Sequence, residues 1–348
     1  MMTVYPYEKL RQAVETILIK AGFSVAQASA MAETFLEADL MGYTTHGLQL
    51  LGLNIDWLQK QETKTDASLE VIADLPAVMV WDAGFLPGPY VMRRALDEAM
   101  SRVKTQGMVT VVIKRSQHIA CQAAYMPRLI EAGLAGLITC VTASEHKVSP
   151  HGGIKGILST NPFAMGAPAA NDGPFIIDVS TSITAGGYVK RALRENKKMD
   201  RAVLKDKQGH ATDDPAVMSD GGSMQPVGGM DHGYKGFAFS LMSEMLTTGL
   251  SGYGRADGEG DQDGEANTVY LQLFDPEKFA GLDAFKRQTA ALAQMMLTAG
   301  DVNSENPVRV PGHRAWQQRQ RQLKEGISLY PAVDKILNDL ADQFDITL

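Results

Sequence analysis

The sequence predicts an α/β protein in which both ends of the chain are helical. Apolar residues recur at helical spacing at the start of the chain and again from Ala315 onward. Between them, from Leu69, short β-rich runs alternate with helical segments, which is typical of a sheet with crossover helices. We therefore expect a helical domain formed by residues 1–70 and 280–348, and an α/β domain formed by residues 71–279.

Composition excludes several classes of function. The chain has 348 residues, 45% of them hydrophobic, and 33 basic against 40 acidic side chains give a net charge of −7. This balance offers no basic surface for nucleic acid or an anionic membrane. No apolar run approaches the roughly 20 residues of a membrane span, and the N-terminus lacks the order of a signal peptide. Cys121 and Cys140 form neither a disulfide framework nor a metal-binding CxxC, so we expect a cytoplasmic protein without a metal.

Three helical segments open the chain. Apolar residues recur every three or four positions from Tyr7 to Lys20, which predicts an amphipathic helix that Ala21-Gly22 ends. Ser24 is placed to cap a second helix that runs to about Leu40. A third helical segment covers 48–58.

Strands and helices then alternate. The expected elements are two short strands between 69 and 84, a helix over 90–104, a strand over 108–114, a helix over about 120–132 and a strand over 136–142. Two further strands, in ILSTNPFAMGAP and PFIIDVSTS, flank the turn Ala170-Asn171-Asp172-Gly173.

The second half of the chain adds loops and helices. We expect a loop over 208–229, a helix from Tyr234, a mobile acidic surface loop over 254–267, a strand in VYLQLFDP, a helix over 282–299 and helices from 315 to the end. The cationic run from Gly186 to Lys205 is either a solvated helix face or a site for a ligand phosphate.

The first candidate catalytic residue lies between the second and third helices. His46 stands in Thr44-Thr45-His46-Gly47, after Gly42 interrupts the helical pattern. A histidine at this position can reach a cleft, and its unperturbed pKa of about 6.5 suits proton transfer near neutral pH. The alternative is a half-buried histidine that forms a hydrogen bond with a threonine.

Other polar residues follow predicted strands, where α/β sheets bind ligands. His118 comes directly after the strand over 108–114; it is either an active-site residue or a buried structural histidine. The helix start beyond it, at Ala120, Cys121 and Gln122, offers free N–H groups to a phosphate.

The segment IIDVSTS and a lysine at a helix start complete the candidate set. Asp178 can accept hydrogen bonds from ribose hydroxyls while the hydroxyls after it meet a diphosphate; capping a turn is the alternative. Lys235, between two glycines, can hold a phosphate or carboxylate as a point charge. No GxGxxG links a strand to a helix, and GxxxxGK[ST], HExxH and GxSxG are absent, which argues against a Rossmann site, phosphoryl transfer, and zincin or α/β-hydrolase chemistry.

The order of these motifs resembles the malate/L-lactate dehydrogenase family of the sulfolactate-dehydrogenase-like fold, over roughly Glu8 to Leu340. The motifs are EADLMGYTTHGLQLL, KRSQHIACQAAYM, SPHGG, STNPFAMGAP, IDVSTS, GYKGFAFSLMSEMLTTGLSG and VRVPG. Relatives in that family include ureidoglycolate dehydrogenase, 2,3-diketo-L-gulonate reductase and Δ1-piperideine-2-carboxylate reductase. The resemblance implies a homodimeric, NAD- or NADP-dependent oxidoreductase with a non-Rossmann mixed-sheet cofactor domain and a helical domain built from both termini.

The resemblance also implies roles for individual residues. His46, in Thr45-His46-Gly47, matches the proposed proton donor or relay of a Ser-His-Gly motif, and His118 matches the base of the ureidoglycolate enzymes. Thr160 matches a threonine that contacts substrate. The implied cofactor contacts are Thr142, Asp178, Val179, Ser180, Thr181, Ser182, Lys235, Gly236, Pro311, Gly312 and His313.

The sequence departs from the family at the substrate pocket. Leu50 stands where many members carry an arginine that binds a substrate carboxylate. Gly186-Gly187-Tyr188 replaces a His-Gly-Asp of the cyclic imino acid reductase, so Leu50, Gly186 and Tyr188 are expected to shape this pocket differently. His313 replaces the usual acid after Pro-Gly, and a GWxxD segment is missing before Asp206.

These observations predict an NAD- or NADP-dependent enzyme that interconverts a small 2-oxo acid and its 2-hydroxy acid. His46 is the expected proton donor, oriented by Thr45, with His118 as a second acid/base or a substrate anchor. One alternative is a cyclic imine reductase acting on pyrroline- or piperideine-2-carboxylate. Another is a non-catalytic binding protein that retains the fold.

Overall fold

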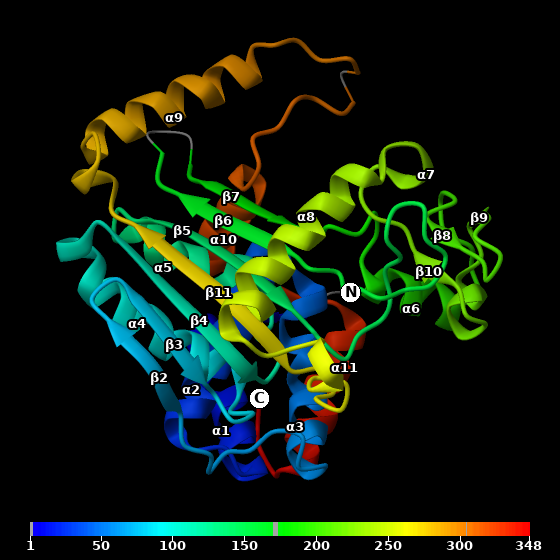
Figure 1. Ribbon diagram of the computed structural model, residues 1–348. Helices are drawn as coiled ribbons and strands as arrows, with labels where there is room; N and C mark the ends of the chain where they lie inside the picture. Colours follow the sequence, from blue (N-terminus) through cyan, green and yellow to red (C-terminus); the bar gives the residue numbers. More distant parts are fainter. Residues whose placement is uncertain (1–2, 170–172, 304) are drawn as a thin grey trace.

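A seven-stranded mixed sheet forms the centre of the protein (Figure 1). The computed structural model describes residues 3–169, 173–303 and 305–348. In spatial order the strands are β2 (Glu70–Leu75), β3 (Val78–Asp82), β4 (Met108–Ser116), β11 (Asn267–Phe274), β5 (Ala135–Val141), β6 (Phe163–Ala167) and β7 (Phe175–Val179). The α/β prediction with a mixed sheet is confirmed.

The strand directions place the C-terminal ends of several strands at one edge of the sheet. β3 and β4 are parallel, and β4 and β5 both run antiparallel to β11, which lies between them. β6 is antiparallel to β5 and β7 is antiparallel to β6. β3, β4, β5 and β7 therefore run in one direction, and the segments that follow them emerge at the same edge.

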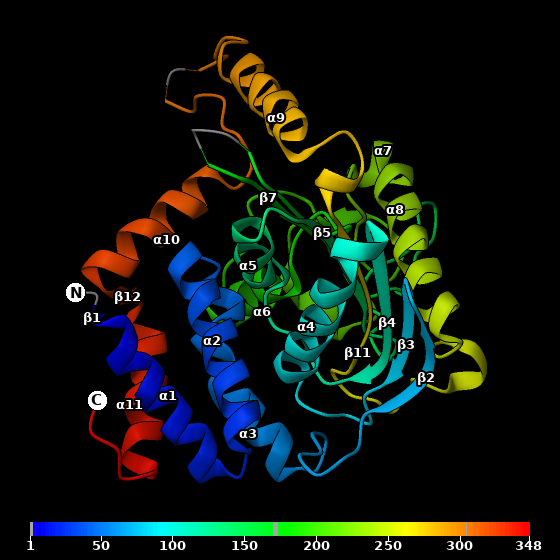
Figure 2. The ribbon, with the colours of Figure 1, turned by 90° about the vertical axis from the view of Figure 1, so that its left-hand side faces the viewer.

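Helices cover both faces of this sheet (Figure 2). α4 (Gly88–Gln106) and α5 (Met126–Glu131) lie on one face, and α8 (Tyr234–Glu244), continued as a wider turn over Met245–Gly249, lies on the other. Val109, Val111 and Ile113 of β4 are fully buried in the core that includes α4, because alternate residues of a strand face the same side.

Both ends of the chain meet in a helical layer, which lies on the side of α4 and α5 that faces away from the sheet (Figure 2). The layer contains α1 (Tyr7–Ala21), α2 (Val25–Met41), α3 (Leu51–Gln59), α10 (His313–Glu325) and α11 (Pro331–Gln343). Its apolar core joins residues such as Leu18, Phe35 and Leu337. The short strands β1 (Thr3–Tyr5) and β12 (Ile327–Leu329) pair antiparallel and hold the two ends together.

The predicted boundaries of the first helices are confirmed by their caps. Ser24 accepts the Gln27 N–H and the Gln27 side chain accepts the Ser24 N–H, which is a complete capping box at the start of α2. Gly42 ends α2 with φ of 87°, a left-handed conformation that glycine adopts without a steric cost.

Two peripheral parts complete the fold. α9 (Leu282–Leu297) extends from the sheet away from the helical layer (Figure 1). Beside the main sheet, β8 (Leu204–Lys205), β9 (Ala211–Thr212) and β10 (Ser223–Met224) pair next to α6 (Gly186–Arg194) and α7 (Gly229–His232). The short 3-10 turns outside the site lie at Pro215–Ser219, Ala256–Gly258 and Pro276–Lys278.

Three expectations from the sequence are wrong. The tail from 315 is not helical throughout, because Ile327–Leu329 forms β12, which pairs with β1 between α10 and α11. The segment 208–229 is not all loop, because Met224 of β10 is buried with Leu204 of β8 in a small apolar core. The helix expected over 120–132 begins only at Gln122, as a 3-10 turn before α5, because Ala120 has φ of 61°. The expected turn at Ala170-Asn171-Asp172-Gly173 falls on 170–172, outside the described residues. Within the described residues, no helix combines the length and apolar character needed to cross a bilayer.

Candidate active site

His46 lies in a 3-10 turn, Thr44–His46, that follows the end of α2. The hydroxyl of Thr45 lies 2.9 Å from His46 Nδ1, which fixes the imidazole and leaves Nε2 for another partner. Burial lowers the pKa of His46 below its ordinary value of 6.5. The residue is half-buried and bound to a threonine, as the structural interpretation expects, and among the described residues no hydrogen bond reaches its Nε2.

Asp39 of α2 fixes the turn from behind. Its Oδ2 accepts the N–H of Leu48 at 2.8 Å. A side chain on Gly47 would approach that same oxygen to 2.5 Å, so only glycine fits between the carboxylate and the turn. Burial raises the pKa of Asp39 to about 7. Sequence reasoning missed this residue; its signal was a lone acid between the apolar residues Ala38 and Leu40 of a helix.

His118 stacks on His46 from the end of β4. The two ring centroids are 6.0 Å apart with an interplanar angle of 18°, and the Trp57 ring is also 6.0 Å from His118. The Ala120 N–H donates to His118 Nδ1 at 3.1 Å, so the imidazole proton resides on Nε2. Burial, with the positive charges around it, lowers the pKa of His118 to about 3, which keeps the ring neutral at physiological pH.

Asn267, the first residue of β11, joins the segments that follow β4 and β5, the strands on either side of β11. Its Oδ1 accepts the Ile119 N–H at 3.0 Å, next to His118, and its Nδ2 donates to Thr142 Oγ1 at 2.9 Å. The predicted contact residue Thr142 is thereby placed at the same edge as His118. Asn267 was also missed, because its partners are far away along the chain and no local pattern marks it.

The predicted contact Asp178 lies at this edge on β7, where its carboxylate already has protein partners. Its Oδ2 accepts the Ala123 N–H at 2.9 Å and lies 3.8 Å from the Cys121 sulfur. Burial raises the pKa of Asp178 to about 6. The carboxylate thus anchors the 3-10 turn Gln122–Tyr125 to the strand.

The hydroxyl residues after Asp178 hold their own segment in place. Ser180 and Ser182 donate to carbonyl groups of their own loop, at 2.8 and 2.7 Å. Thr181 bonds to the Ser240 hydroxyl at 2.6 Å and donates to the Thr160 carbonyl at 2.9 Å. These contacts place Thr160 beside the segment 180–182, and the bond to Ser240 holds that segment against α8.

Two predicted cofactor residues carry buried polar atoms without a protein partner. Among the described residues, neither Gln122 Oε1 nor His313 Nε2 accepts or donates a hydrogen bond to the protein. The His313 ring lies 6.3 Å from the Phe175 ring, and the Pro311 carbonyl accepts the Ile176 N–H at 3.2 Å, so this segment packs on β7. Such orphaned atoms are expected where a polar ligand binds.

Comparison with known proteins assigns a family to this arrangement. A model of the family described as malate/L-lactate dehydrogenase matches residues 5–338. The chain belongs to the malate/L-lactate dehydrogenase family. It is thereby an oxidoreductase of a family whose dehydrogenase chemistry implies a nicotinamide cofactor, and the resemblance drawn from its motifs is confirmed.

Its relatives align over nearly their whole length. A malate dehydrogenase from Pyrococcus horikoshii is 26% identical over 98% of this chain and 95% of the relative. A Δ1-pyrroline-2-carboxylate/Δ1-piperideine-2-carboxylate reductase from Pseudomonas syringae pv. tomato is 29% identical over 96% and 95%. The solved structure of the Pyrococcus horikoshii malate dehydrogenase superposes with a TM-score of 0.87, at 25% identity, over 99% of this chain and 97% of that one.

The remaining residues predicted from the family resemblance lie in other environments. Leu50 is only 8% exposed and belongs to the apolar core of the helical layer. Lys235 and Tyr188 are exposed, on α8 and α6. Gly236 is buried, and a side chain there would approach the Thr181 carbonyl to 2.7 Å, so α8 packs closely on that segment. Gly186 is the first residue of α6, and a β-carbon added there would meet no atom within 4 Å. Val179, at the end of β7, is 55% exposed.

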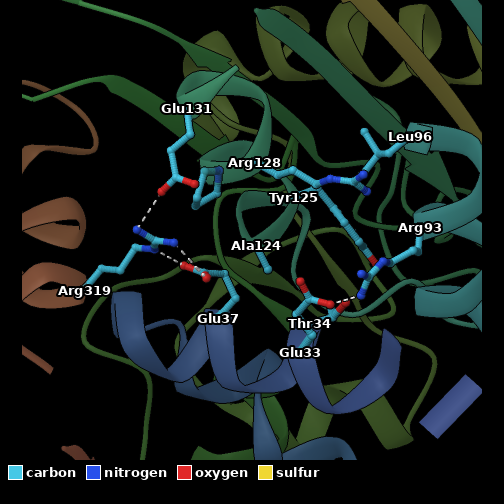
Figure 3. A pocket seen from close by; sticks show the side chains of 11 residues that line it. Glu33, Thr34, Glu37, Arg93, Leu96, Ala124, Tyr125, Arg128, Glu131 and Arg319 are labelled. Carbon is cyan, nitrogen blue, oxygen red and sulfur yellow. Dashed lines mark hydrogen bonds and ion pairs between the residues drawn. The ribbon is translucent and has the colours of Figure 1, made fainter. Parts of the chain in front are cut away.

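A hollow lies between α2, α4, α5 and α10 (Figure 3), with a volume of about 210 Å³. Most of its lining charges pair with one another, but Nη1 of Arg128 is buried and has no protein partner among the described residues. Arg319 contacts Glu37 and lies 3.0 Å from Glu131, and Arg93 pairs with Glu33. We refer to it as the arginine–glutamate cavity; the catalytic candidates His46 and His118 do not line it. In the part of the chain that the structure describes, no three His, Cys, Asp or Glu side chains gather as a metal site.

Proposed function

We propose that this family member reduces the carbonyl of a small 2-oxo acid with NADH or NADPH, and oxidises the matching 2-hydroxy acid in reverse. The observation that carries the proposal is the stacked pair of His46 and His118, 6.0 Å apart, at the edge where β4, β5 and β7 end. Two imidazoles with different fixed hydrogen bonds suit a reaction that must move one proton and hold one oxygen.

His46 is the proton donor in this proposal. When bound, the nicotinamide supplies the hydride, and the carbonyl oxygen then gains negative charge that a nearby acid must neutralise. Thr45 occupies His46 Nδ1 at 2.9 Å, which directs Nε2 toward the substrate. The lowered pKa of His46, caused by burial, makes the protonated imidazole a stronger acid and eases transfer to the oxygen.

His118 anchors the substrate rather than exchanging a second proton. Its Nδ1 accepts the Ala120 N–H at 3.1 Å, so protonation of that nitrogen would break a backbone hydrogen bond. The ring is thus held as a neutral Nε2–H donor toward the substrate oxygen. This contact would stabilise the charge that develops during reduction.

The cofactor residues proposed from the sequence fit a polar ligand. Gln122 Oε1 and His313 Nε2 are buried and free of protein partners in the described chain, so each can bond to a nicotinamide amide or a ribose hydroxyl. Thr142, Asp178 to Ser182, Lys235 with Gly236, and Pro311 with Gly312 complete the proposed set. The exposed ammonium of Lys235 is suited to a phosphate.

We also propose a cytoplasmic homodimer. The outer surface of α8 and of the turn after it is unusually apolar, with Phe239 54%, Leu241 42%, Met242 46% and Met245 63% exposed. An exposed apolar patch of this kind marks a contact surface. Cys121 and Cys140 are both free thiols, which accords with a reducing compartment. Light scattering should give the mass of two chains, and Met245→Glu should reduce it toward one.

Cofactor oxidation tests the function directly. The purified protein is mixed with NADH or NADPH and a panel of 2-oxo acids and cyclic imino acids, and loss of the reduced cofactor is followed by absorbance. We expect turnover with a 2-oxo acid. Turnover with cyclic imino acids alone would favour the reductase activity named for the 29% identical relative. Cofactor binding without turnover across the panel would favour a non-catalytic binding protein.

A further inference from the structure

A 2-oxo acid carries a carboxylate beside its reacting carbonyl, and that charge needs a cation in a partly buried site. His118 is held neutral by its bond to Ala120, and Leu50 is a core residue, so neither supplies one. We infer that Lys147, assisted by Lys190, binds the carboxylate of the substrate next to the histidine pair. This inference rests on the proposed function and names the residues that select acids over neutral carbonyl compounds.

The backbone around Lys147 is fixed on both sides. Its N–H donates to the Leu158 carbonyl at 2.9 Å, and its own carbonyl accepts the Met224 N–H at 2.8 Å. Upstream, Arg255 donates to the Ala143 carbonyl at 2.7 Å and to the Glu145 carbonyl at 3.2 Å. The lysine is therefore carried by a loop whose position is set after β5 rather than by a free surface segment.

A small apolar core brings Lys190 to the same region. Val148, directly after Lys147, is fully buried, and Val189, directly before Lys190, is 4% exposed in the same cluster. The cluster thus joins the loop after β5 to α6. Lys190 lies on the exposed side of α6, where its charge can reach the site without being buried.

Both ammonium groups act on the catalytic histidine. The loop that carries Lys147 begins at Thr142, whose hydroxyl accepts a hydrogen bond from Asn267 Nδ2 at 2.9 Å, and Asn267 Oδ1 accepts the Ile119 N–H next to His118 at 3.0 Å. The loop therefore starts beside the histidine, and the charges of Lys147 and Lys190 contribute, after burial and His46, to the lowered pKa of His118. Lys190 also lowers the pKa of Lys147, although burial contributes most to that shift. Lys147 and Lys190 are the cations named here and Glu145 and Glu265 the carboxylates that act on Lys147, so an anion would be bound by the free donors of Lys147 and not by a net positive charge.

The immediate surroundings of Lys147 leave capacity for a ligand. Its side chain is 29% exposed and forms an ion pair with Glu145, while Glu265 is the other carboxylate that acts on it. An ammonium has three donors, so the pair with Glu145 leaves hydrogen atoms for a second carboxylate. A substrate carboxylate would accept a hydrogen bond from Lys147 alongside Glu145, and the charge of Lys190 would attract it from a longer distance.

Replacement of the lysines by methionine tests the inference. Lys147→Met keeps the side-chain volume and removes the charge; we expect KM for the 2-oxo acid to rise about 10- to 100-fold, as for loss of a charged hydrogen bond. Lys190→Met should raise it by about 2- to 5-fold, because its exposed charge acts through solvent. Lys155→Met, an exposed lysine on the same loop, is the matched control and should change nothing.

Two further variants separate binding from loop structure. If Lys147 only held its loop through Glu145, Glu145→Gln would raise KM as Lys147→Met does; we expect Glu145→Gln to leave KM unchanged or lower it. Lys147→Arg, which restores the charge, should recover most of the lost affinity. An unchanged KM in Lys147→Met, or equal effects of Glu145→Gln and Lys147→Met, would overturn the inference.

Binding of oxalate to the protein–NADH complex, measured by calorimetry, separates this inference from the proposed function. Oxalate affinity that falls about 10-fold or more in Lys147→Met supports the anchor even if the native protein turns over no 2-oxo acid, in which case the function fails. Normal turnover with oxalate affinity unchanged in Lys147→Met would overturn the anchor and leave the function standing. Absence of both turnover and oxalate binding would overturn both.

Discussion

The histidine site and the arginine–glutamate cavity are both rich in buried polar groups, yet they differ in how those groups are paired. In the cavity, Arg319 contacts Glu37 and Glu131, and the residues of the Arg319–Glu37 pair are only 11% and 14% exposed (Figure 3). In the histidine site, among the described residues, Nε2 of His46 and Nε2 of His118 have no protein partner, while each Nδ1 is fixed. The cavity pairs most of its charges and leaves only Nη1 of Arg128 without a protein partner in the described chain, whereas the histidine site keeps one nitrogen of each ring available.

The difference teaches that a hollow lined by charges is not by itself a reactive site. The ion pairs of the cavity join α2, α5 and α10, so their role is to hold helices from both ends of the chain together. Catalysis requires groups that are held in position and still able to bond to a ligand, as we propose for the two histidines at the strand ends. The two regions should therefore respond oppositely to mutation, one in stability and the other in turnover.

The largest expected effect is that of His46→Ala on turnover. Loss of a positioned acid should lower kcat by about 10²- to 10⁴-fold, with the dissociation constant of the reduced cofactor unchanged. His232→Ala, on an exposed histidine, is the matched control and should keep native kcat. Steady-state kinetics and cofactor fluorescence give both quantities; equal kcat in the two variants would remove His46 from the mechanism.

Arg319→Met should affect stability instead. It leaves the carboxylate of Glu37 buried without its cation, and we expect a loss of about 3 kcal/mol in the free energy of unfolding measured in urea. The same helix carries the exposed Arg321, and Arg321→Met should stay within about 0.5 kcal/mol of the native protein. A large fall in kcat per folded molecule of Arg319→Met, without a loss of stability, would place catalysis in the cavity.

Asp39, which holds the turn that carries His46, should make the stability of the protein depend on pH. Burial raises its pKa to about 7 in the folded protein from 3.8, so the folded state binds the proton more tightly than the unfolded state. Its contribution to stability is then fully present below about pH 4 and is lost as the pH rises through about 7. Relative to Asp39→Asn, the native protein should lose about 4 kcal/mol over that interval, since each unit of pKa difference corresponds to about 1.4 kcal/mol. Parallel pH profiles of unfolding for the two proteins would contradict this assignment.

Gly47→Ala should give the smallest of these effects. The added methyl group would lie 2.5 Å from Asp39 Oδ2, so the turn must move and carry His46 with it. We expect kcat to fall about 10-fold with little change in cofactor affinity, as for a small displacement of a catalytic group. The control is Gly52→Ala, where the nearest atom is 3.8 Å away. If both alanine variants keep native kcat, the turn does not position the imidazole.

Much of the fold follows from local patterns in the sequence. The apolar spacing before Gly22, the cap at Ser24 and the run of buried residues in β4 each depend on neighbours within a few positions, and each predicted the observed element. The expected helix start at Ala120 failed because that residue takes a left-handed conformation, with its N–H bonded to the His118 ring. Apolar periodicity carries no information about such a contact.

The site was predictable only where chemistry coincides with an element boundary. His46 and His118 stood out because each follows the end of a helix or strand. Asp39 and Asn267 did not, since their roles depend on partners that tertiary structure brings together; Asn267 lies 148 residues from the N–H that it accepts. Such residues become recognisable only once the strand ends are placed side by side.

A crystal structure of the protein with reduced cofactor and oxalate tests the central claim most directly. We predict the nicotinamide ring at the edge where β4, β5 and β7 end, and a ligand oxygen within about 2.6–3.2 Å of His46 Nε2. The carboxyl group of the ligand should contact Lys147. A nicotinamide bound in the arginine–glutamate cavity, or one far from both imidazoles, would contradict the account.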